Sequence, residues 1–125
     1  MTKKITVLGS TNIDRVVSVP RFAQSGETLH TDSHLTNAMG GKGLNQGVAV
    51  ARSGVQTNMI TKVGREFNIA ENMAVKNLMT NHVMFSETAE TGQAYITVSE
   101  ETGDNMIYIY GGANADLTVA DVNAH

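Results

Sequence analysis

Residues 39–47, MGGKGLNQG, place three glycines and one lysine within four consecutive positions, directly before a run with helical spacing. Glycine has no side chain, so its backbone can approach another group closely and can adopt positive φ. Gly54 follows the helical run and is typical of the residue just past a helix end. A helix N-terminus presents free N–H groups and a partial positive charge. We therefore expect a closely packed loop leading into a helix, with Lys42 and Asn45 adding donors to a polar pocket.

The composition is that of a globular chain and argues against several classes of partner. Of 125 residues, 41% are hydrophobic and 17% are charged, which predicts one domain with a buried core. The net charge of −3 indicates no basic surface for a nucleic acid, and no apolar run suits a membrane span or a signal peptide. Cysteine is absent, so neither a disulfide nor a thiolate metal site is expected. We expect a cytoplasmic protein with no nucleic-acid or membrane partner.

Strands and helices alternate along much of the chain. Lys4–Leu8 is a short apolar run stopped by a glycine and predicts a buried strand, and Gln56–Val63 predicts a second strand. Helical spacing of apolar residues predicts a helix over residues 68–80, and residues 81–85 predict a further short strand. This alternation is typical of an α/β layer built on a parallel sheet.

Four other segments predict a small peripheral sheet beside that layer. Residues 15–19 and 28–36 read as extended but carry too little apolar surface for a central sheet. Residues 93–99 and Asn105–Tyr110 are β-prone runs joined by five residues that include a glycine, which is a hairpin signal.

The end of the chain predicts the beginning of another helix. Thr118 and Asp121 match a capping box, so a helix should start at Val119, about two turns before the last residue, His125. The alternation of strands and helices begins a new helix here and then stops, which suggests that the sequence is part of a longer protein. The alternative is that this short helix packs as a C-terminal cap.

Asn12 and Asp14 follow the first predicted strand and project to the same side if the backbone is extended. Ligands of open α/β sheets bind just beyond the carboxyl ends of the strands, which makes both residues candidates for ligand contact. The alternative is that Asn12 caps a turn and Asp14 pairs with Arg15 in water.

The glycine stretch fails the spacing tests for known phosphate loops. A P-loop requires Ser or Thr after its lysine, whereas Gly43 follows here. A dinucleotide fingerprint requires glycine where Gln46 stands, and no predicted strand directly precedes the stretch. His30 and His34 would lie about 13 Å apart in extended backbone, so no metal site is expected. The remaining amide, carboxylate and ammonium groups suit vicinal hydroxyls, and a polyol or sugar is the expected ligand.

Several strings, in this order along the chain, resemble the N-terminal region of ribokinases, which belong to a family of carbohydrate and nucleoside kinases. The most specific is GGKGLNQ at residues 40–46, with GSTNID at residues 9–14 upstream. Residues 26–28, 61–64 and 112–115 are further landmarks, so the resemblance covers essentially the whole chain. The lysine favours a ribokinase or deoxyribokinase over fructokinase and adenosine kinase relatives.

The resemblance implies the N-terminal part of a doubly wound, Rossmann-like α/β fold with a small β-sheet lid. Residues 1–125 would form this part, with lid strands within 13–38 and 93–111, and the C-terminal nucleotide-binding half would be absent. The substrate-binding residues implied are Asn12, Asp14, Gly40, Gly41, Lys42 and Asn45, covered by the lid residues Ala94 and Ile96. One departure is at residues 65–70, where relatives have acidic residues and a glycine; it should have little effect on the sugar contacts.

The activity implied is transfer of a phosphoryl group from ATP, with Mg²⁺, to the primary hydroxyl of D-ribose or a related pentose by a homodimer paired through its lids. The Gly-Ala-Gly-Asp segment that provides the general base in relatives is absent from this chain. We therefore expect no catalytic residue and no activity in this chain alone. The alternative is a non-catalytic sugar-binding or dimerisation module.

Overall fold

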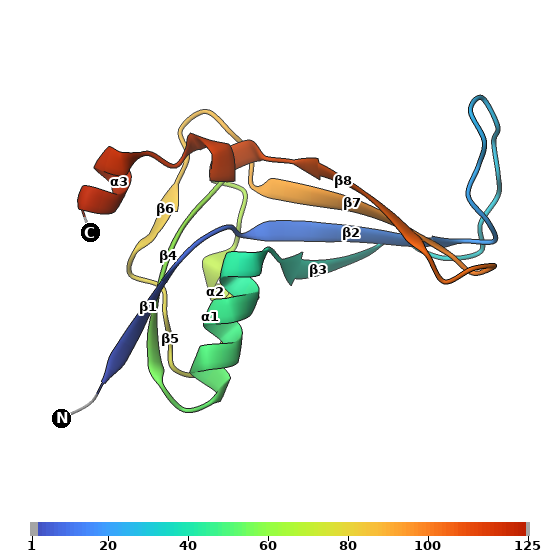
Figure 1. Ribbon diagram of the computed structural model, residues 1–125. Helices are drawn as coiled ribbons and strands as arrows, with labels where there is room; N and C mark the ends of the chain where they lie inside the picture. Colours follow the sequence, from blue (N-terminus) through green and yellow to red (C-terminus); the bar gives the residue numbers. More distant parts are fainter. Residues whose placement is uncertain (1–2, 125) are drawn as a thin grey trace.

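The computed structural model describes residues 3–124, which form two β-sheets of four strands each (Figure 1). The first sheet is parallel: its central strand β4 (Gln56–Val63) pairs with β1 (Lys4–Leu8), β5 (Leu78–Met79) and β6 (Val83–Phe85). The second sheet has the order β3-β2-β7-β8 and projects away from the first. A mixed α/β layer with a separate sheet is the architecture that the sequence predicts.

Helix α1 (Lys42–Arg52) packs on the parallel sheet and supplies part of the hydrophobic core. Its buried face contains Leu44 and Ala51, which lie against strand residues such as Met59 and Val63. The helix ends as predicted, because Gly54 has a φ of +99° and its N–H donates to the carbonyl of Ala51. This packing fixes the N-terminal end of α1, where the glycine stretch lies.

The second sheet is the predicted lid, and its middle strands are parallel. Strand β2 (Asn12–Val19) pairs with β3 (Thr36–Gly40) on one side and with β7 (Gly92–Ser99) on the other. Strand β8 (Asn105–Tyr110) forms the predicted antiparallel hairpin with β7 and is an edge of the sheet. Since β1 ends at Leu8 and β2 begins at Asn12, the two sheets meet at a three-residue turn.

The prediction of a buried first strand is wrong, although the strand itself is present. Only Val7 of β1 is buried, and Ile5 and Leu8 are 44% and 51% exposed. The reason is topological, since β1 stands at the end of the strand order and pairs with β4 alone.

The prediction of a helix over residues 68–80 is also wrong. Helix α2 (Ile69–Asn72) is a single turn capped by Asn68, and Met73 already leaves helical dihedral angles. Asn77 then has a φ of +72°, and its carbonyl accepts a hydrogen bond from Thr57 N–H as β5 begins. Pairing with β4 thus ends the helical backbone, while Met73 and Leu78 still reach the core.

Residues 28–35 form no strand, contrary to the prediction for residues 28–36. The lid strand in this region is β3, whose register pairs Thr36 with Val16 and Gly40 with Asn12. A strand therefore does lead directly into the glycine stretch, but it belongs to the lid and runs antiparallel to β2. A dinucleotide-binding turn follows a strand of the parallel sheet, so the missing glycine at position 46 still excludes that motif.

The C-terminal segment is a 3-10 turn, η1 (Gly112–Asp116), followed by α3 (Val119–Asn123). The predicted capping box is present, with reciprocal bonds between Thr118 and Asp121. Lys62 of β4 holds this segment: its Nζ donates to Asp121 Oδ2 at 2.8 Å and to the Asp116 carbonyl at 3.1 Å. None of the helices within residues 3–124 has the length and apolar character needed to cross a bilayer.

Candidate functional site

Seven of the eight predicted site residues line one cavity of about 460 Å³ between the parallel layer and the lid. They are Asn12, Asp14, Gly41, Lys42, Asn45, Ala94 and Ile96. The eighth, Gly40, lies directly behind Asp14, because a Cβ built on Gly40 would collide with that carboxylate. The residues predicted from the sequence lie on or beside β2, β3, α1 and β7, and the fold brings these elements together at one place.

The glycine stretch packs against the turn between β1 and β2. The Leu44 N–H donates to the Ser10 carbonyl at 2.9 Å, and a Cβ on Gly43 would lie 2.5 Å from backbone atoms of Gly9 and Ser10. Gly41 has a φ of +94°, and a Cβ there would lie 2.7 Å from the Ser10 carbonyl oxygen. The close approach predicted for this loop is thus made to the chain's own turn, which fixes the start of α1 relative to β2.

The first turn of α1 faces the cavity, and its free N–H groups give this end of the helix a partial positive charge. Its N-cap, Gly41, makes no side-chain hydrogen bond, and no acidic residue lies in the first turn. Lys42 and Asn45, one turn apart in sequence, both line the cavity from this end. The helix dipole and the lysine therefore both favour an electron-rich ligand at this wall.

Asp14 is the carboxylate in the cavity lining, and none of the side chains in residues 3–124 forms an ion pair with it. Partial burial raises the pKa of the Asp14 carboxyl above its usual value. Arg15 does not pair with Asp14, because its guanidinium donates to Gln93 Oε1 at 2.8 Å and to Asn37 Oδ1 at 3.4 Å. Asp14 is thus an acceptor open to O–H donors from a ligand.

Asn114 of η1 joins the cavity from far along the chain, and sequence reasoning did not identify it as a site residue. Its side-chain oxygen accepts the Thr11 N–H at 3.0 Å. Its nitrogen donates to the Thr11 carbonyl at 3.1 Å and to Asn12 Oδ1 at 2.7 Å. Asn12 is therefore held by Asn114 and does not cap the turn. The sequence signals for Asn114 were its place in a glycine-containing loop and in the landmark at residues 112–115.

Two further apolar residues, Ile107 and Ile109 of β8, line the cavity and were not predicted. The hairpin register places Ile109 opposite Ala94 and Ile107 opposite Ile96, so the four side chains form one apolar wall. The predicted hairpin implies which residues of β8 lie on the same face as Ala94 and Ile96, since directly opposed residues of an antiparallel pair share a face.

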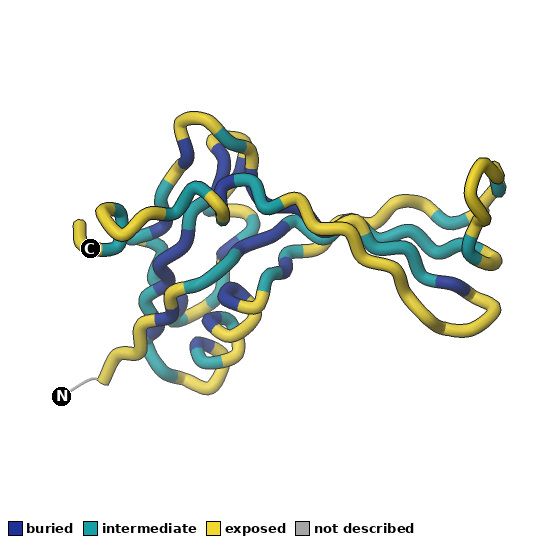
Figure 2. Tube along the Cα trace, turned by 45° about the horizontal axis from the view of Figure 1, so that its top comes forward, coloured by how far each residue is buried: buried dark blue, intermediate teal, exposed yellow. Residues whose placement is uncertain are grey.

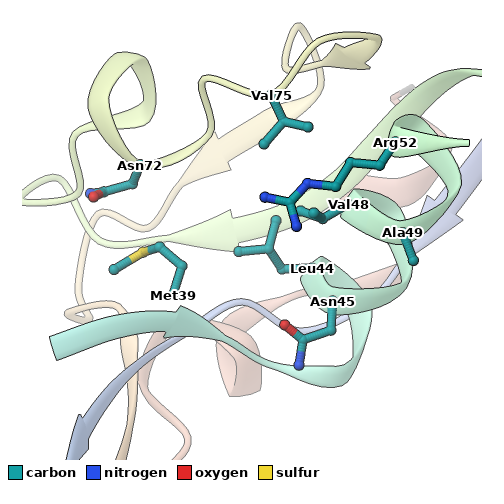
Figure 3. Close-up of a pocket in the computed structure, with 8 residues that line it drawn as sticks. All are labelled: Met39, Leu44, Asn45, Val48, Ala49, Arg52, Asn72 and Val75. Carbon is teal, nitrogen blue, oxygen red and sulfur yellow. The ribbon is translucent and has the colours of Figure 1, made fainter. Parts of the chain in front are cut away.

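A second cavity, of about 330 Å³, lies on another side of α1 (Figure 3). Its floor is apolar, with Met39, Leu44 and Val48, and the Arg52 side chain extends over it from the helix. Asn45 borders both cavities, and it is the one predicted site residue in this lining. Within residues 3–124, no group of three His, Cys, Asp or Glu side chains is arranged to hold a metal ion.

Comparison with known proteins agrees with this architecture. Residues 2–125 match the model of the pfkB family carbohydrate kinases. The ribokinase of Staphylococcus aureus (strain COL) is 46% identical over an alignment of 125 positions, which covers 98% of this chain and 41% of that protein.

Solved structures show the same likeness. The crystal structure of Sa239 superimposes with a TM-score of 0.89 and 43% identity, over 99% of this chain and 42% of that one. The Arabidopsis thaliana ribokinase, complexed with ribose and ATP, superimposes with a TM-score of 0.76 and 28% identity over 91% of this chain and 38% of that one. This chain thus spans about two fifths of the length of these relatives. It belongs to the pfkB family of carbohydrate kinases.

Proposed function

We propose that this chain is the sugar-binding and lid portion of a ribokinase, whose complete form phosphorylates D-ribose at its primary hydroxyl using ATP. One observation carries the proposal: a carboxylate, three amides and an ammonium group surround a single cavity that an apolar lid wall closes on one side. A pentose carries both kinds of group, because its vicinal hydroxyls suit the polar wall and its C–H groups suit the apolar wall. The resemblance to ribokinases supports this reading of the cavity.

Each side chain in the cavity has a role that follows from its hydrogen-bonding capacity. Asp14 accepts O–H bonds, and a bond to a charged acceptor is stronger than a bond between neutral groups. Lys42 donates only, and Asn45 can both donate and accept. Gly40 supplies the space that the Asp14 carboxylate occupies. Ala94 and Ile96 would cover an apolar face of the sugar.

We assign to this chain the acceptor half of the reaction and no residue that binds ATP or Mg²⁺. Phosphoryl transfer depends on groups that position and neutralise the γ-phosphate. Relatives of this family are more than twice as long, and the proposal places these groups in the remaining part. The purified 125-residue chain should therefore produce no ribose phosphate from D-ribose and ATP in a coupled assay, and turnover would contradict this assignment.

Titration calorimetry with D-ribose in the absence of ATP tests the binding site directly. The chain should give saturable heat, and Asp14→Asn should weaken D-ribose binding at least tenfold, as expected for the loss of about 1.5–3 kcal/mol from a charged hydrogen bond. Asp32→Asn, in the exposed loop between β2 and β3, is the matched control and should bind as the parent does. A flat titration of the parent chain would reject the site.

We further propose that two copies pair through their lids, so that the chain would also serve as a dimerisation module. All six residues of the edge strand β8 are exposed, and Tyr108 and Ile109 are 70% and 68% exposed (Figure 2). An apolar unpaired edge strand is a ready surface for pairing with another chain. Light scattering should give a dimer that Tyr108→Lys converts to a monomer, and a monomeric parent would contradict the pairing.

A further inference from the structure

The side chain of Asn114 connects the turn between the two sheets to the cavity, and nothing in the proposed sugar contacts accounts for it. We propose that Asn114 is a positioning residue that fixes the Asn12 amide in one orientation, so that Asn12 only donates hydrogen bonds to a ligand. The proposal rests on sugar binding at this cavity for its consequence in affinity. The orientation itself rests on the contacts of Asn114 alone.

The orientation of the Asn114 amide is determined by the backbone of Thr11. The Thr11 N–H can only donate, so the atom that it contacts at 3.0 Å must be the side-chain oxygen of Asn114. The Thr11 carbonyl can only accept, so the atom that contacts it at 3.1 Å must be the side-chain nitrogen. The two contacts agree with each other, and a flipped amide would lose both of them.

The orientation of Asn12 then follows from that of Asn114. The second hydrogen of the Asn114 amide points to an atom of Asn12 at 2.7 Å, which must be an acceptor and hence Oδ1. The Asn12 nitrogen has no partner among residues 3–124, and none of their buried side-chain polar atoms is left without one. Since Asn12 lines the cavity, this nitrogen is accessible there and offers N–H groups to a ligand.

The cavity therefore offers opposite hydrogen-bonding groups at two positions of β2, a donor at Asn12 and an acceptor at Asp14. A hydroxyl that faces Asn12 must accept a hydrogen bond, and a hydroxyl that faces Asp14 must donate one. Vicinal hydroxyls satisfy both requirements, because each O–H can rotate to donate on one side and accept on the other. An Asn12 amide free to rotate would present either end and lose this selection.

The surrounding backbone leaves room for this pair of amides. A Cβ on Gly92 would collide with Asn114 Nδ2 and would lie 2.7 Å from Asn12 Oδ1. The turn that carries Asn114 is held in place by a 2.7 Å hydrogen bond from Ala113 N–H to the Glu90 carbonyl. The fold thus supports the amide pair from both sides.

Hydrogen exchange of side-chain amides tests the orientation without any ligand. In the ¹⁵N-labelled chain, both side-chain amide protons of Asn114 should exchange slowly and those of Asn12 should exchange rapidly. Asn114→Ala and Asn12→Ala assign the two pairs of resonances, each by the loss of one pair. Slow exchange at Asn12 together with rapid exchange at Asn114 would overturn the proposal, whatever the chain binds.

A double-mutant cycle with D-ribose tests the consequence. Asn114→Ala should weaken D-ribose binding about tenfold in the parent chain but less than twofold in the Asn12→Ala background, because Asn114 acts through Asn12. The matched control, Asn81→Ala in an exposed turn, should change neither value. Equal losses in both backgrounds would show a general scaffold role and overturn the proposal. If the parent chain binds no D-ribose while the exchange pattern holds, the sugar assignment fails and the amide orientation stands.

Discussion

The parallel layer and the lid are both four-stranded sheets, but they bury their residues very differently (Figure 2). Five of the eight residues of β4 are buried, whereas all six residues of β8 are exposed. The parallel layer is covered by α1 and is held by side-chain packing as well as by strand pairing. The lid depends mainly on strand pairing. The candidate site lies between them: Lys42 and Asn45 come from α1 of the packed layer, whereas Asn12, Asp14 and the apolar wall come from strands of the lid.

The difference in packing between the two regions is tested most directly by truncating one large aliphatic side chain in each of them. Leu44→Ala in α1 should lower the free energy of unfolding by about 2–5 kcal/mol, because Leu44 is only 2% exposed in the core. Ile109→Ala in β8 should cost less than about 0.5 kcal/mol at protein concentrations where the lids are unpaired, because Ile109 is then 68% exposed. Urea denaturation followed by circular dichroism measures both. Equal costs in the unpaired chain would show that Ile109 packs against another part of the same chain in solution.

A second pair of variants tests the junction where the two regions meet. Alanine in place of glycine inside a helix normally stabilises by about 0.5–1 kcal/mol. Gly43→Ala should nevertheless destabilise by about 1–3 kcal/mol, because its Cβ would meet rigid backbone at Gly9 and Ser10.

Gly47→Ala is the matched control in the same helix. Its Cβ would meet the Met59 sulfur at 3.0 Å, which is part of a flexible side chain, so the change should be near neutral. A thermal melt of both variants distinguishes the two cases. If Gly43→Ala were neutral, the turn between β1 and β2 would not be fixed by α1.

The sequence predicted local elements well and missed features that depend on distant partners. The hairpin of β7 and β8, the start of α1 and the capping box at Thr118 are set by neighbouring residues. The helix expected over residues 68–80 fails because its apolar spacing also suits an irregular segment whose Leu78 pairs with β4.

The same distinction holds within the site. Asn12 and Asp14 were predicted from their place after a strand, and Lys42 and Asn45 from the glycine stretch, and all four line the same cavity. Asn114 acts on residues 102 and 103 positions away in the chain, and no local pattern reports such a contact. The apolar residues of β8 alternate with other apolar residues, so only the register with β7 shows which ones face the cavity.

The smallest expected effect concerns Asp14, at the boundary of the two regions. Burial raises the pKa of its carboxyl in the folded chain above the usual value. The folded state therefore holds this proton more tightly than the unfolded state, and ionisation of Asp14 destabilises the fold as the pH rises from the unfolded value upwards. Asp14→Asn removes this cost. It should raise the free energy of unfolding at pH 7 by well under 1 kcal/mol, since the carboxylate is only partly buried and solvent still screens it.

The difference between Asp14→Asn and the parent chain should vanish below about pH 3, where both side chains are neutral. Urea denaturation between pH 3 and pH 7 measures it, with Asp32→Asn as the exposed control. If Asp14 binds a ligand as proposed, its ionised carboxylate would weaken the fold and strengthen binding, which is the trade-off between stability and function expected of a binding residue. A loss of stability at pH 7 in Asp14→Asn would instead mean that Asp14 supports the junction between the sheets, and would remove the electrostatic reason for placing a ligand hydroxyl beside it.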